Sequence, residues 1–515
     1  MAEKHSPASH EEGLISKGEE RFEFWRRQVG LWLGPLLFIL LLVFPVQGVS
    51  PEAAHLAAIL SLTLVWWICE PVPIPVTAML APSLCVIFGV GNAKEILAAF
   101  GDPIVFIFIG GFIIAEAMMV HKLDRRIALG VLGIRWIGCS VSRIFLGFGF
   151  ISLVLSMWLS NTATTAMMVP IALGLVGEIR EMLHRQKTPT SQSDDMKLAT
   201  GLMLMLAYAA SIGGLGTPIG TPPNLIGIGL IRDAVNVDIN FFDWMRFALP
   251  AVLVMFAFLY LIIILMYRPT INKIDGLGTY LTERRQSVGP WTRGQINTLI
   301  AFFVAVLLWV MPGILKVMGE STAELAVKYD RMMPEGIVAI VAATLLFLLP
   351  INLRKNEFTL SWQQAVKIDW GTILLFGGGI ALGKLSFDTG LARHMGESII
   401  AGINVTSLGG ITLMAIIFGI VISETASNTA SATMVIPVAI SVAQAAGVDP
   451  LAPALGACMG ASFGFMLPVS TPPNAIVYGT GYVPITRMVK TGVVFDVVGA
   501  GIIWVTVMTL SDILR

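Results

Sequence analysis

The chain alternates long apolar stretches with short polar loops. Apolar runs long enough to cross a bilayer, about 17 to 25 residues each, recur throughout and begin with residues 31–46 and 55–69. Two further apolar stretches, residues 144–179 and 408–445, carry clusters of polar side chains in their interior. This pattern predicts an all-α polytopic membrane protein with about eleven transmembrane helices and two additional hairpins.

Basic residues in the loops indicate how the helices are threaded, because short loops rich in Lys and Arg stay in the cytoplasm. The basic loops share one side only if residues 144–179 and 408–445 each enter and leave by the same face, as re-entrant helical hairpins. Backbone that turns inside a membrane must line protein or a water-filled cavity. We therefore expect both hairpin tips at a cavity, the N-terminus in the cytoplasm and the C-terminus outside. The loops are residues 122–143, 180–197, 268–293, 354–355 and 487–490.

Four short motifs occur twice, in the same order, once in each half of the chain. The second copy follows the first by 268 residues for the first two pairs, by 267 for the third and by 250 for the fourth. The threading makes an odd number of reversals between the first pair, so the two halves are predicted to be inverted-topology repeats. Secondary transporters use this architecture, with the binding site near the midplane between the repeats. The pairs are Phe108-Ile-Gly-Gly with Phe376-Gly-Gly-Gly, Leu123-Asp-Arg125 with Leu391-Ala-Arg393, Ser160-Asn-Thr-Ala163 with Ser427-Asn-Thr-Ala430, and Thr221-Pro-Pro-Asn224 with Thr471-Pro-Pro-Asn474.

The hairpin tips are rich in hydroxyl and carboxamide side chains. Such residues cap helices and favour turns, so simple capping is one interpretation. Their position within apolar sequence and their repetition favour an oxygen-rich ligand site, since polar groups inside a membrane mark functional sites. The residues are Ser156, Ser160, Asn161 and Thr162 in the first tip and Ser423, Ser427, Asn428 and Thr429 in the second.

The two Thr-Pro-Pro-Asn motifs, at 221–224 and 471–474, also interrupt apolar segments. Two consecutive prolines must break a helix, because each removes a donor and clashes with the preceding turn. A plain proline kink is the alternative interpretation. Unwound backbone exposes carbonyl oxygens that suit a hard cation, and the asparagine adds another oxygen. We therefore predict broken helices that take part in cation binding.

Composition narrows the class of protein. Hydrophobic residues make up 56% of the chain and charged residues 13%, whereas about a quarter of a soluble domain is charged, so a water-soluble enzyme is excluded. The 33 basic and 33 acidic residues balance, so the chain has no net positive charge that would attract nucleic acid. The polar first 28 residues lack the apolar core of a signal peptide and are expected to form a cytosolic tail.

Charge is almost missing from the polar motifs. No Arg or Lys lies in either hairpin tip or in either Thr-Pro-Pro-Asn motif, and Glu424 is the one charged residue between 398 and 448. An anionic substrate would then be balanced by helix N-termini, each worth about half a unit charge, and by bound cations. Sodium is the simplest candidate, because the ligands are oxygens and the sequence shows no histidine or carboxylate pair for a proton relay. We expect Glu424 to be structural, hydrogen-bonded to the hairpin backbone.

These motifs resemble those of the divalent anion/sodium symporter family, whose mark is a Ser-Asn-Thr triplet in each of two hairpins, followed by a broken helix ending in Pro-Asn. The similarity runs from about residue 30 to the end. It implies a homodimer in which a transport domain moves as an elevator against a scaffold domain. The implied parts are a cytosolic tail (1–30), scaffold helices (31–143 and 296–397), a transport domain (144–267 and 398–515) and a cytosolic connection (268–295).

The resemblance also implies which residues bind which ligand. The substrate carboxylates would meet both triplets, with Thr471 and Pro472 beside them. One departure is that Gly220 is matched by Ser470 in the second half, so the two cation sites need not be coordinated alike. The implied ligands are Ser156, Ser160, Asn161, Gly220 and Asn224 for one sodium ion, and Ser423, Asn428, Ser470 and Asn474 for a second.

Together these features predict sodium-coupled symport of C4-dicarboxylates such as succinate, malate or fumarate across the cell membrane, without an organic cofactor. A sodium-independent exchanger of the same fold and a sodium/sulfate or sodium/citrate symporter remain alternatives. A membrane enzyme would need an acid/base or metal constellation, and the six histidines form no cluster. A channel is a further alternative, but inverted repeats with broken helices favour alternating access.

Overall fold

The computed structural model describes residues 17–134, 136–137, 140–185, 192–267, 276–403 and 405–514. Most of the predicted N-terminal tail and residues 268–275 of the predicted cytosolic connection lie outside these ranges. Ten described helices are long and apolar enough to cross a membrane, or eleven if one bent pair counts as a single span. This confirms an all-α polytopic membrane protein. Two of the ten, Asn161–Met182 and Leu408–Thr425, are arms of the predicted hairpins.

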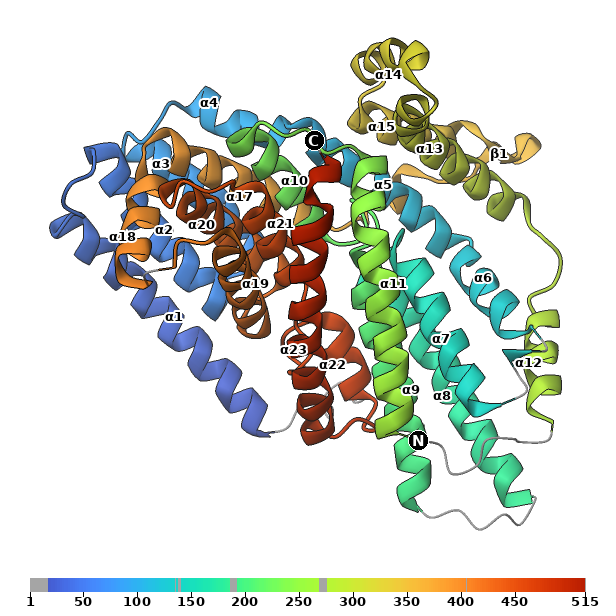
Figure 1. The fold of residues 1–515 in the computed structure, drawn as a ribbon. Coiled ribbons are helices and arrows are strands. Elements are labelled where there is room, and N and C mark those ends of the chain that lie inside the picture. The colour runs from blue at the N-terminus through green and yellow to red at the C-terminus, as the bar shows by residue number, and fades with distance from the viewer. Residues whose placement is uncertain are drawn as a thin grey trace, which may run out of the picture.

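The first half of the chain runs from the slanting helix α1, at one side of Figure 1, to the long central helix α11. Its elements are α1 (Lys17–Val43), α2 (Pro51–Cys69), α3 (Ile74–Ile87), α4 (Ala93–Ala98), η1 (Ala99–Gly101), α5 (Pro103–Val120), α6 (Leu123–Leu132), α7 (Val141–Ser156), α8 (Asn161–Arg185), α9 (Gln192–Gly214), α10 (Pro222–Val235) and α11 (Phe241–Met266). Helix α12 (Leu277–Gln286) follows in the connection to the second half.

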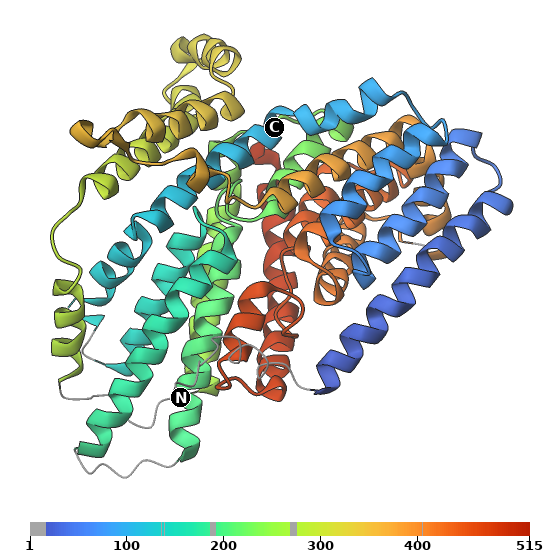
Figure 2. The same ribbon diagram turned by 180° about the vertical axis from the view of Figure 1, so that it is seen from behind.

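The second half begins at α13 and ends beside α11 (Figures 1 and 2). Its elements are α13 (Arg293–Val317), α14 (Glu320–Met332), α15 (Glu335–Leu348), β1 (Pro350–Asn352), η3 (Leu353–Lys355), β2 (Glu357–Phe358), α16 (Trp362–Ala365), α17 (Trp370–Asp388), α18 (Leu391–Ile403), α19 (Leu408–Thr425), α20 (Asn428–Ala445), α21 (Leu451–Gly460), α22 (Pro472–Gly479), α23 (Ile485–Leu510) and η4 (Ser511–Leu514). The small antiparallel β1–β2 hairpin was not predicted.

Both predicted hairpins are present. Helices α7 and α8 form the first hairpin and α19 and α20 the second, and within each pair the two arms pack against one another across a short turn. Each first arm begins at a serine cap: Ser140 Oγ accepts from Arg143 N and Ser407 Oγ from Gly410 N, both at 3.3 Å. The two serines are related by the same offset as the two triplets, so even the start of the hairpin repeats.

Each hairpin packs against the helix that leads into a break, α7 on α9 and α19 on α21. Glycine permits the close approach: a Cβ at Gly213 would lie 2.2 Å from the Leu153 carbonyl oxygen, and one at Gly460 2.6 Å from that of Ile416. Such distances are shorter than any ordinary contact, so larger residues would force the helices apart. The close packing holds each hairpin tip beside its own broken helix.

Candidate functional site

The tips of the two hairpins have the same internal geometry. Ser156 Oγ donates a hydrogen bond to Asn161 Oδ1 at 2.7 Å, and Ser423 Oγ donates to Asn428 Oδ1 at 2.8 Å. Each bond spans the turn and joins the end of one arm to the first residue of the other. The turn therefore holds the triplet asparagine in a defined orientation in both halves.

The side chains of the triplet serines, Ser160 and Ser427, cap the second arms of the hairpins, as the capping interpretation predicts. Ser160 Oγ accepts from Ala163 N and Ser427 Oγ from Ala430 N, both at 3.2 Å. A capping hydroxyl keeps a second lone pair, so this role is compatible with ligand binding. Capping and binding are thus not exclusive alternatives here.

The helix breaks also repeat. The first break, residues 215–221, separates α9 from α10, and the second break, residues 461–471, separates α21 from α22. The amide nitrogen of Asn224 donates to the carbonyls of Gly214 and Thr217 at 2.9 and 2.8 Å. That of Asn474 donates to the carbonyls of Gly464 and Leu467 at 2.8 and 3.0 Å. Each residue of the second set follows its counterpart in the first by 250 residues: Asn474 follows Asn224, Gly464 follows Gly214 and Leu467 follows Thr217. The two break loops therefore have the same hydrogen-bond pattern.

These amide bonds leave both carboxamide oxygens without a donor. Asn224 and Asn474 are fully buried, and their Oδ1 atoms have no hydrogen-bond partner among the described residues. A buried polar atom that is not paired costs about 1 to 3 kcal/mol. Because both nitrogens are already held, flipping the amide would only exchange one unpaired group for others. A hard cation, which prefers oxygen ligands, fits both positions.

A cavity of about 670 Å³ brings both halves together. All eight predicted substrate ligands line it, and so do Gly220 and Ser470. Four predicted sodium ligands do not line it and are buried: Ser156, Asn224, Ser423 and Asn474. The residues predicted to bind sodium therefore lie partly in the cavity wall and partly behind it. Which ligand each residue binds stays a prediction; the lining residues are Ser160, Asn161, Thr162, Ser427, Asn428, Thr429, Thr471 and Pro472.

Six helices begin at this cavity, and four of them, α8, α10, α20 and α22, start within the repeated motifs. Helix N-termini carry partial positive charge and unpaired N–H groups, so they attract anions. The sequence prediction overlooked one residue here: Lys367, from the loop before α17, lines the same cavity together with Glu116 and Asp369. Lys367 interacts electrostatically with Glu116. One lysine and two carboxylates thus line the cavity, so its side chains add no net positive charge and the positive field comes from the helix ends.

Comparison with known proteins agrees with these motifs. Residues 25–514 match the family described as the sodium:sulfate symporter transmembrane region. The chain belongs to this symporter family. This membership makes it a multi-pass membrane transporter.

Two relatives and one solved structure are similar over most of the symporter. The sodium-dependent dicarboxylate transporter SdcS of Staphylococcus saprophyticus is 36% identical over 467 residues, 90% of this chain and 87% of that protein. SdcS of Staphylococcus aureus strain USA300 is 34% identical over 509 residues, 97% and 94% of the two chains. The crystal structure of the Alcanivorax borkumensis YdaH transporter is 11% identical, with a TM-score of 0.53 over 93% of this chain and 97% of that chain, and shows a shared fold.

A second cavity, of about 1080 Å³, reveals the direction of the repeats in this symporter. Phe112 and Glu116 in the C-terminal half of α5 line the first cavity, whereas their equivalents in α17, Ile380 and Lys384, line the second. At the other end, Pro103 at the start of α5 lines the second cavity, whereas Gly371 at the start of α17 lines the first. Helices α5 and α17 therefore run in opposite directions, which confirms inverted-topology repeats.

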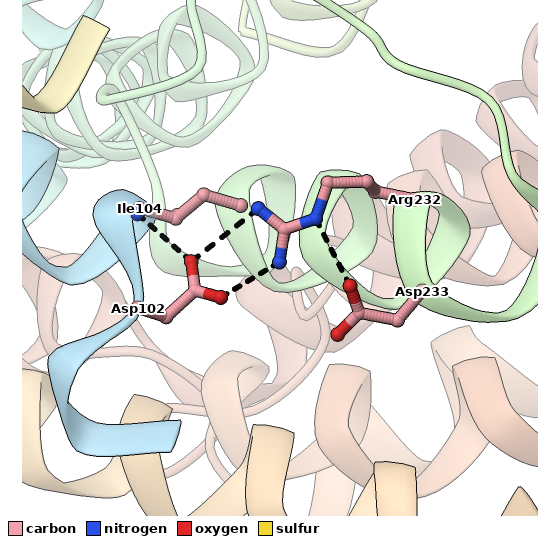
Figure 3. Close-up of polar contacts among 4 residues, drawn as sticks. All are labelled: Asp102, Ile104, Arg232 and Asp233. Carbon is pink, nitrogen blue, oxygen red and sulfur yellow. Dashed lines mark hydrogen bonds and ion pairs between the residues drawn. The ribbon is translucent and has the colours of Figure 1, made fainter. Parts of the chain in front are cut away.

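An ion pair between Asp102 and Arg232 lines the second cavity, and Figure 3 shows its contacts. Arg232, near the end of α10, approaches Asp102 with both terminal nitrogens, at 2.7 and 3.4 Å. Its Nε also contacts Asp233 at 2.9 Å. Asp102 caps α5 as well, accepting from Ile104 N at 2.9 Å. One carboxylate thus ties the start of α5 to the helix that follows the first break.

Glu424 contacts the second break rather than the hairpin backbone that we predicted. Its carboxylate accepts from the backbone of Met466 and Leu467 at 2.8 and 3.2 Å and from Ser470 Oγ at 2.5 Å. Glu424 therefore joins the hairpin tip to the broken helix. The equivalent first-half position is the apolar Met157, so the two breaks differ at this point.

The expectation that no carboxylate pair is present was wrong. Asp496 of α23 is 5% exposed and interacts with the Glu424 carboxyl. Neither carboxylate oxygen of Asp496 has a donor in the part of the chain that the structure describes. A lone acidic residue within an apolar helix was the signal that could have identified it from sequence.

Proposed function

We propose that this protein carries a C4-dicarboxylate, such as succinate, malate or fumarate, across the cell membrane together with sodium ions. The observation that carries the proposal is the pair of buried oxygens, Asn224 Oδ1 and Asn474 Oδ1, which have no donor among the described residues. Each lies behind one triplet, in a setting of oxygen atoms that suits sodium. The relatives named sodium-dependent dicarboxylate transporters support the same substrate.

The substrate carboxylates are proposed to bind at the two triplets, one from each repeat. Ser160 to Thr162 and Ser427 to Thr429 face one cavity and begin α8 and α20. A dianion with a carboxylate at either end fits two anion-attracting helix starts related by a pseudo-two-fold axis. Thr471 and Pro472 line the cavity beside the second triplet and complete the contacts.

The two sodium ions are proposed to bind behind the triplets. The first is held by Ser156, Ser160, Asn161, Gly220 and Asn224, and the second by Ser423, Asn428, Ser470 and Asn474. Because Asn161 and Asn428 line the cavity and also contact the buried serines, they link cation and substrate. Sodium bound first would orient the triplet and add positive charge, so uptake should depend cooperatively on sodium.

Alternating access is proposed to bring the site to either side of the membrane. Basic residues that follow α5 favour a cytoplasmic position for that end, so we propose that the substrate cavity opens inward. The same reasoning keeps the N-terminus cytoplasmic and the C-terminus outside. The ion pair between Asp102 and Arg232 then closes the outer side. It joins the proposed scaffold (31–143 and 296–397) to the transport domain (144–267 and 398–515), which we propose to move as an elevator within a homodimer.

Uptake of labelled succinate into proteoliposomes tests the function. A sodium gradient should drive accumulation, and replacement of sodium by choline should abolish it. Equal uptake in both buffers would overturn sodium coupling and identify an exchanger. Malate and fumarate should compete with succinate, whereas stronger competition by sulfate or citrate would reassign the substrate.

A further inference from the structure

Four hydroxyl side chains on α7, α8 and α9 lie buried without hydrogen-bond partners among the described residues. Ser152, Thr164 and Thr165 are fully buried and Ser211 is 2% exposed. Their oxygen atoms find no partner among the residues that the structure describes. Hydroxyls within helices commonly bond to the carbonyl four residues earlier, as Thr298 does to Gly294 and Ser441 does to Pro437 in this chain. Four exceptions in one region therefore indicate a missing ligand.

The four hydroxyls lie on α7, α8 and α9, each about one turn along its helix from Ser156, Asn161 or Gly214. Ser156 contacts Asn161 across the hairpin tip, and one turn deeper the arms carry Ser152 on α7 and Thr164 and Thr165 on α8. A Cβ on Gly214 would lie 2.5 Å from Asn161 Oδ1, which places α9 against the same asparagine. Ser211 lies one turn deeper on α9. Residues three or four apart share a helix face, so the hydroxyls gather beneath Asn161.

The second half lacks this arrangement. The positions equivalent to the four hydroxyls, by the offsets of the triplets and of the breaks, are Gly419, Ser431, Ala432 and Ala461. Ser431 Oγ donates to the Gly419 carbonyl at 3.0 Å. A Cβ on Gly419 would come within 3.0 Å of the Ala457 carbonyl oxygen. Tight packing and one internal hydrogen bond thus leave a single unpaired buried hydroxyl among the described residues of the second half, Ser462 Oγ, beside Ala461.

We propose that Ser152, Thr164, Thr165 and Ser211 bind an additional sodium ion, one helical turn below the first sodium site. Neutral oxygens in a buried position select a hard cation, and Asn161 lies between this position and the cavity. The inference rests on the proposed function, because sodium must reach the first site before it can pass deeper. Two sodium ions neutralise a dicarboxylate, so a further one would leave the loaded carrier with one positive charge.

Equilibrium binding of radioactive sodium to the purified full-length protein tests this site without transport. Ser152→Ala and Thr164→Val should each bind one sodium ion fewer per chain than the wild type. Ser431→Ala, which removes the matched hydroxyl of the second half, should leave the count unchanged. Thr164→Ser keeps the hydroxyl and should restore it. A variant that binds as many ions as the wild type would overturn the proposal and leave a buried water as the ligand.

Transport supplies an independent measurement. An inside-negative potential should accelerate wild-type succinate uptake, because the loaded carrier is positive, and should have no such effect on Ser152→Ala or Thr164→Val. Retained voltage dependence in both variants would contradict the site even if sodium coupling holds. A wild type that shows no sodium-dependent uptake at all would instead overturn the proposed function, so the two failures are distinguishable.

Discussion

The rings of Phe108 and Phe376 meet edge to face, with their centroids 5.2 Å apart. The two residues occupy equivalent positions in the two repeats, and both are almost fully buried. A residue that touches its own counterpart must lie near the axis that relates the repeats. The pseudo-two-fold axis therefore passes between α5 and α17.

This axis explains why the binding site has two similar halves. Each hairpin tip and each break approaches the cavity from its own repeat, and the two triplets meet there. Exact symmetry is lost at Ser470 and Glu424, which have no polar counterparts in the first half, and at the buried hydroxyls below Asn161. The differences concern the proposed cation positions rather than the triplets.

The first prediction concerns the unpaired carboxamide oxygens. Asn224→Ala or Asn474→Ala should raise the sodium concentration for half-maximal succinate uptake tenfold or more. Loss of an interaction with a charged group costs roughly 1.5 to 3 kcal/mol, and about 1.4 kcal/mol is tenfold in affinity. Sodium titrations of initial uptake rates measure the change.

Asn297→Ala is the matched control for both variants. Asn297 donates to the Pro350 carbonyl and to Thr359 Oγ1 at 3.2 and 2.8 Å, away from the cavity. Its removal should leave the sodium titration unchanged. If all three variants titrate like the wild type, the breaks do not bind the coupling ion.

The second prediction concerns the triplets. Asn161→Ala or Asn428→Ala removes a carboxamide that lines the cavity and contacts the buried serine behind it. Both the apparent sodium affinity and the apparent succinate affinity should fall, each by about tenfold. Uptake titrated with each ligand separately measures the two effects, and near-normal titrations in well-expressed variants would remove the triplets from the site.

Local sequence was enough to predict the hairpins, the breaks and their repetition. A proline pair breaks a helix and a polar triplet favours a turn through contacts within a few residues of sequence. Their spacing along the apolar runs therefore predicts the hairpins and the breaks. The joint cavity was also expected, because inverted repeats meet at their interface.

Contacts between distant segments could not be predicted in the same way. Arg232 meets Asp102 across 130 residues, and Asp496 lies on α23, several helices beyond Glu424. Lys367 reaches the cavity from a loop outside every motif. Such pairs depend on how the helices pack, which no window of sequence contains.

The third prediction contrasts the two buried carboxyls. Glu424 accepts three hydrogen bonds, so Glu424→Gln should lower stability, because an amide nitrogen cannot accept the bonds that a carboxylate oxygen accepts. Asp496 has no donor among the described residues. Asp496→Asn should therefore be tolerated or stabilising, since it removes a like-charge contact and provides a donor to Glu424.

Thermal unfolding of the two purified variants, with uptake measured in parallel, decides this contrast. Glu424→Gln should unfold at a lower temperature and require more sodium, since Ser470 loses its partner. Asp496→Asn should match or exceed the wild type in both measurements. The reverse order would mean that Asp496, rather than Glu424, holds the second break in place.

The last prediction concerns the ion pair between Asp102 and Arg232. Asp102→Asn keeps the oxygen that caps Ile104 N but removes the charge, so it separates capping from pairing. The pair is partly exposed, at 14% and 29%, and such pairs contribute about 1 kcal/mol. Asp102→Asn and Arg232→Gln should each shift the balance between conformations roughly fivefold away from the inward-open state. A cysteine at Thr162, in a background without native cysteines, should then react more slowly with a membrane-impermeant reagent added on the cytoplasmic side.

Asp388→Asn, which removes another carboxylate lining the same cavity, is the control and should leave the labelling rate unchanged. Unchanged labelling in both pair variants would show that the ion pair does not hold the outer side closed.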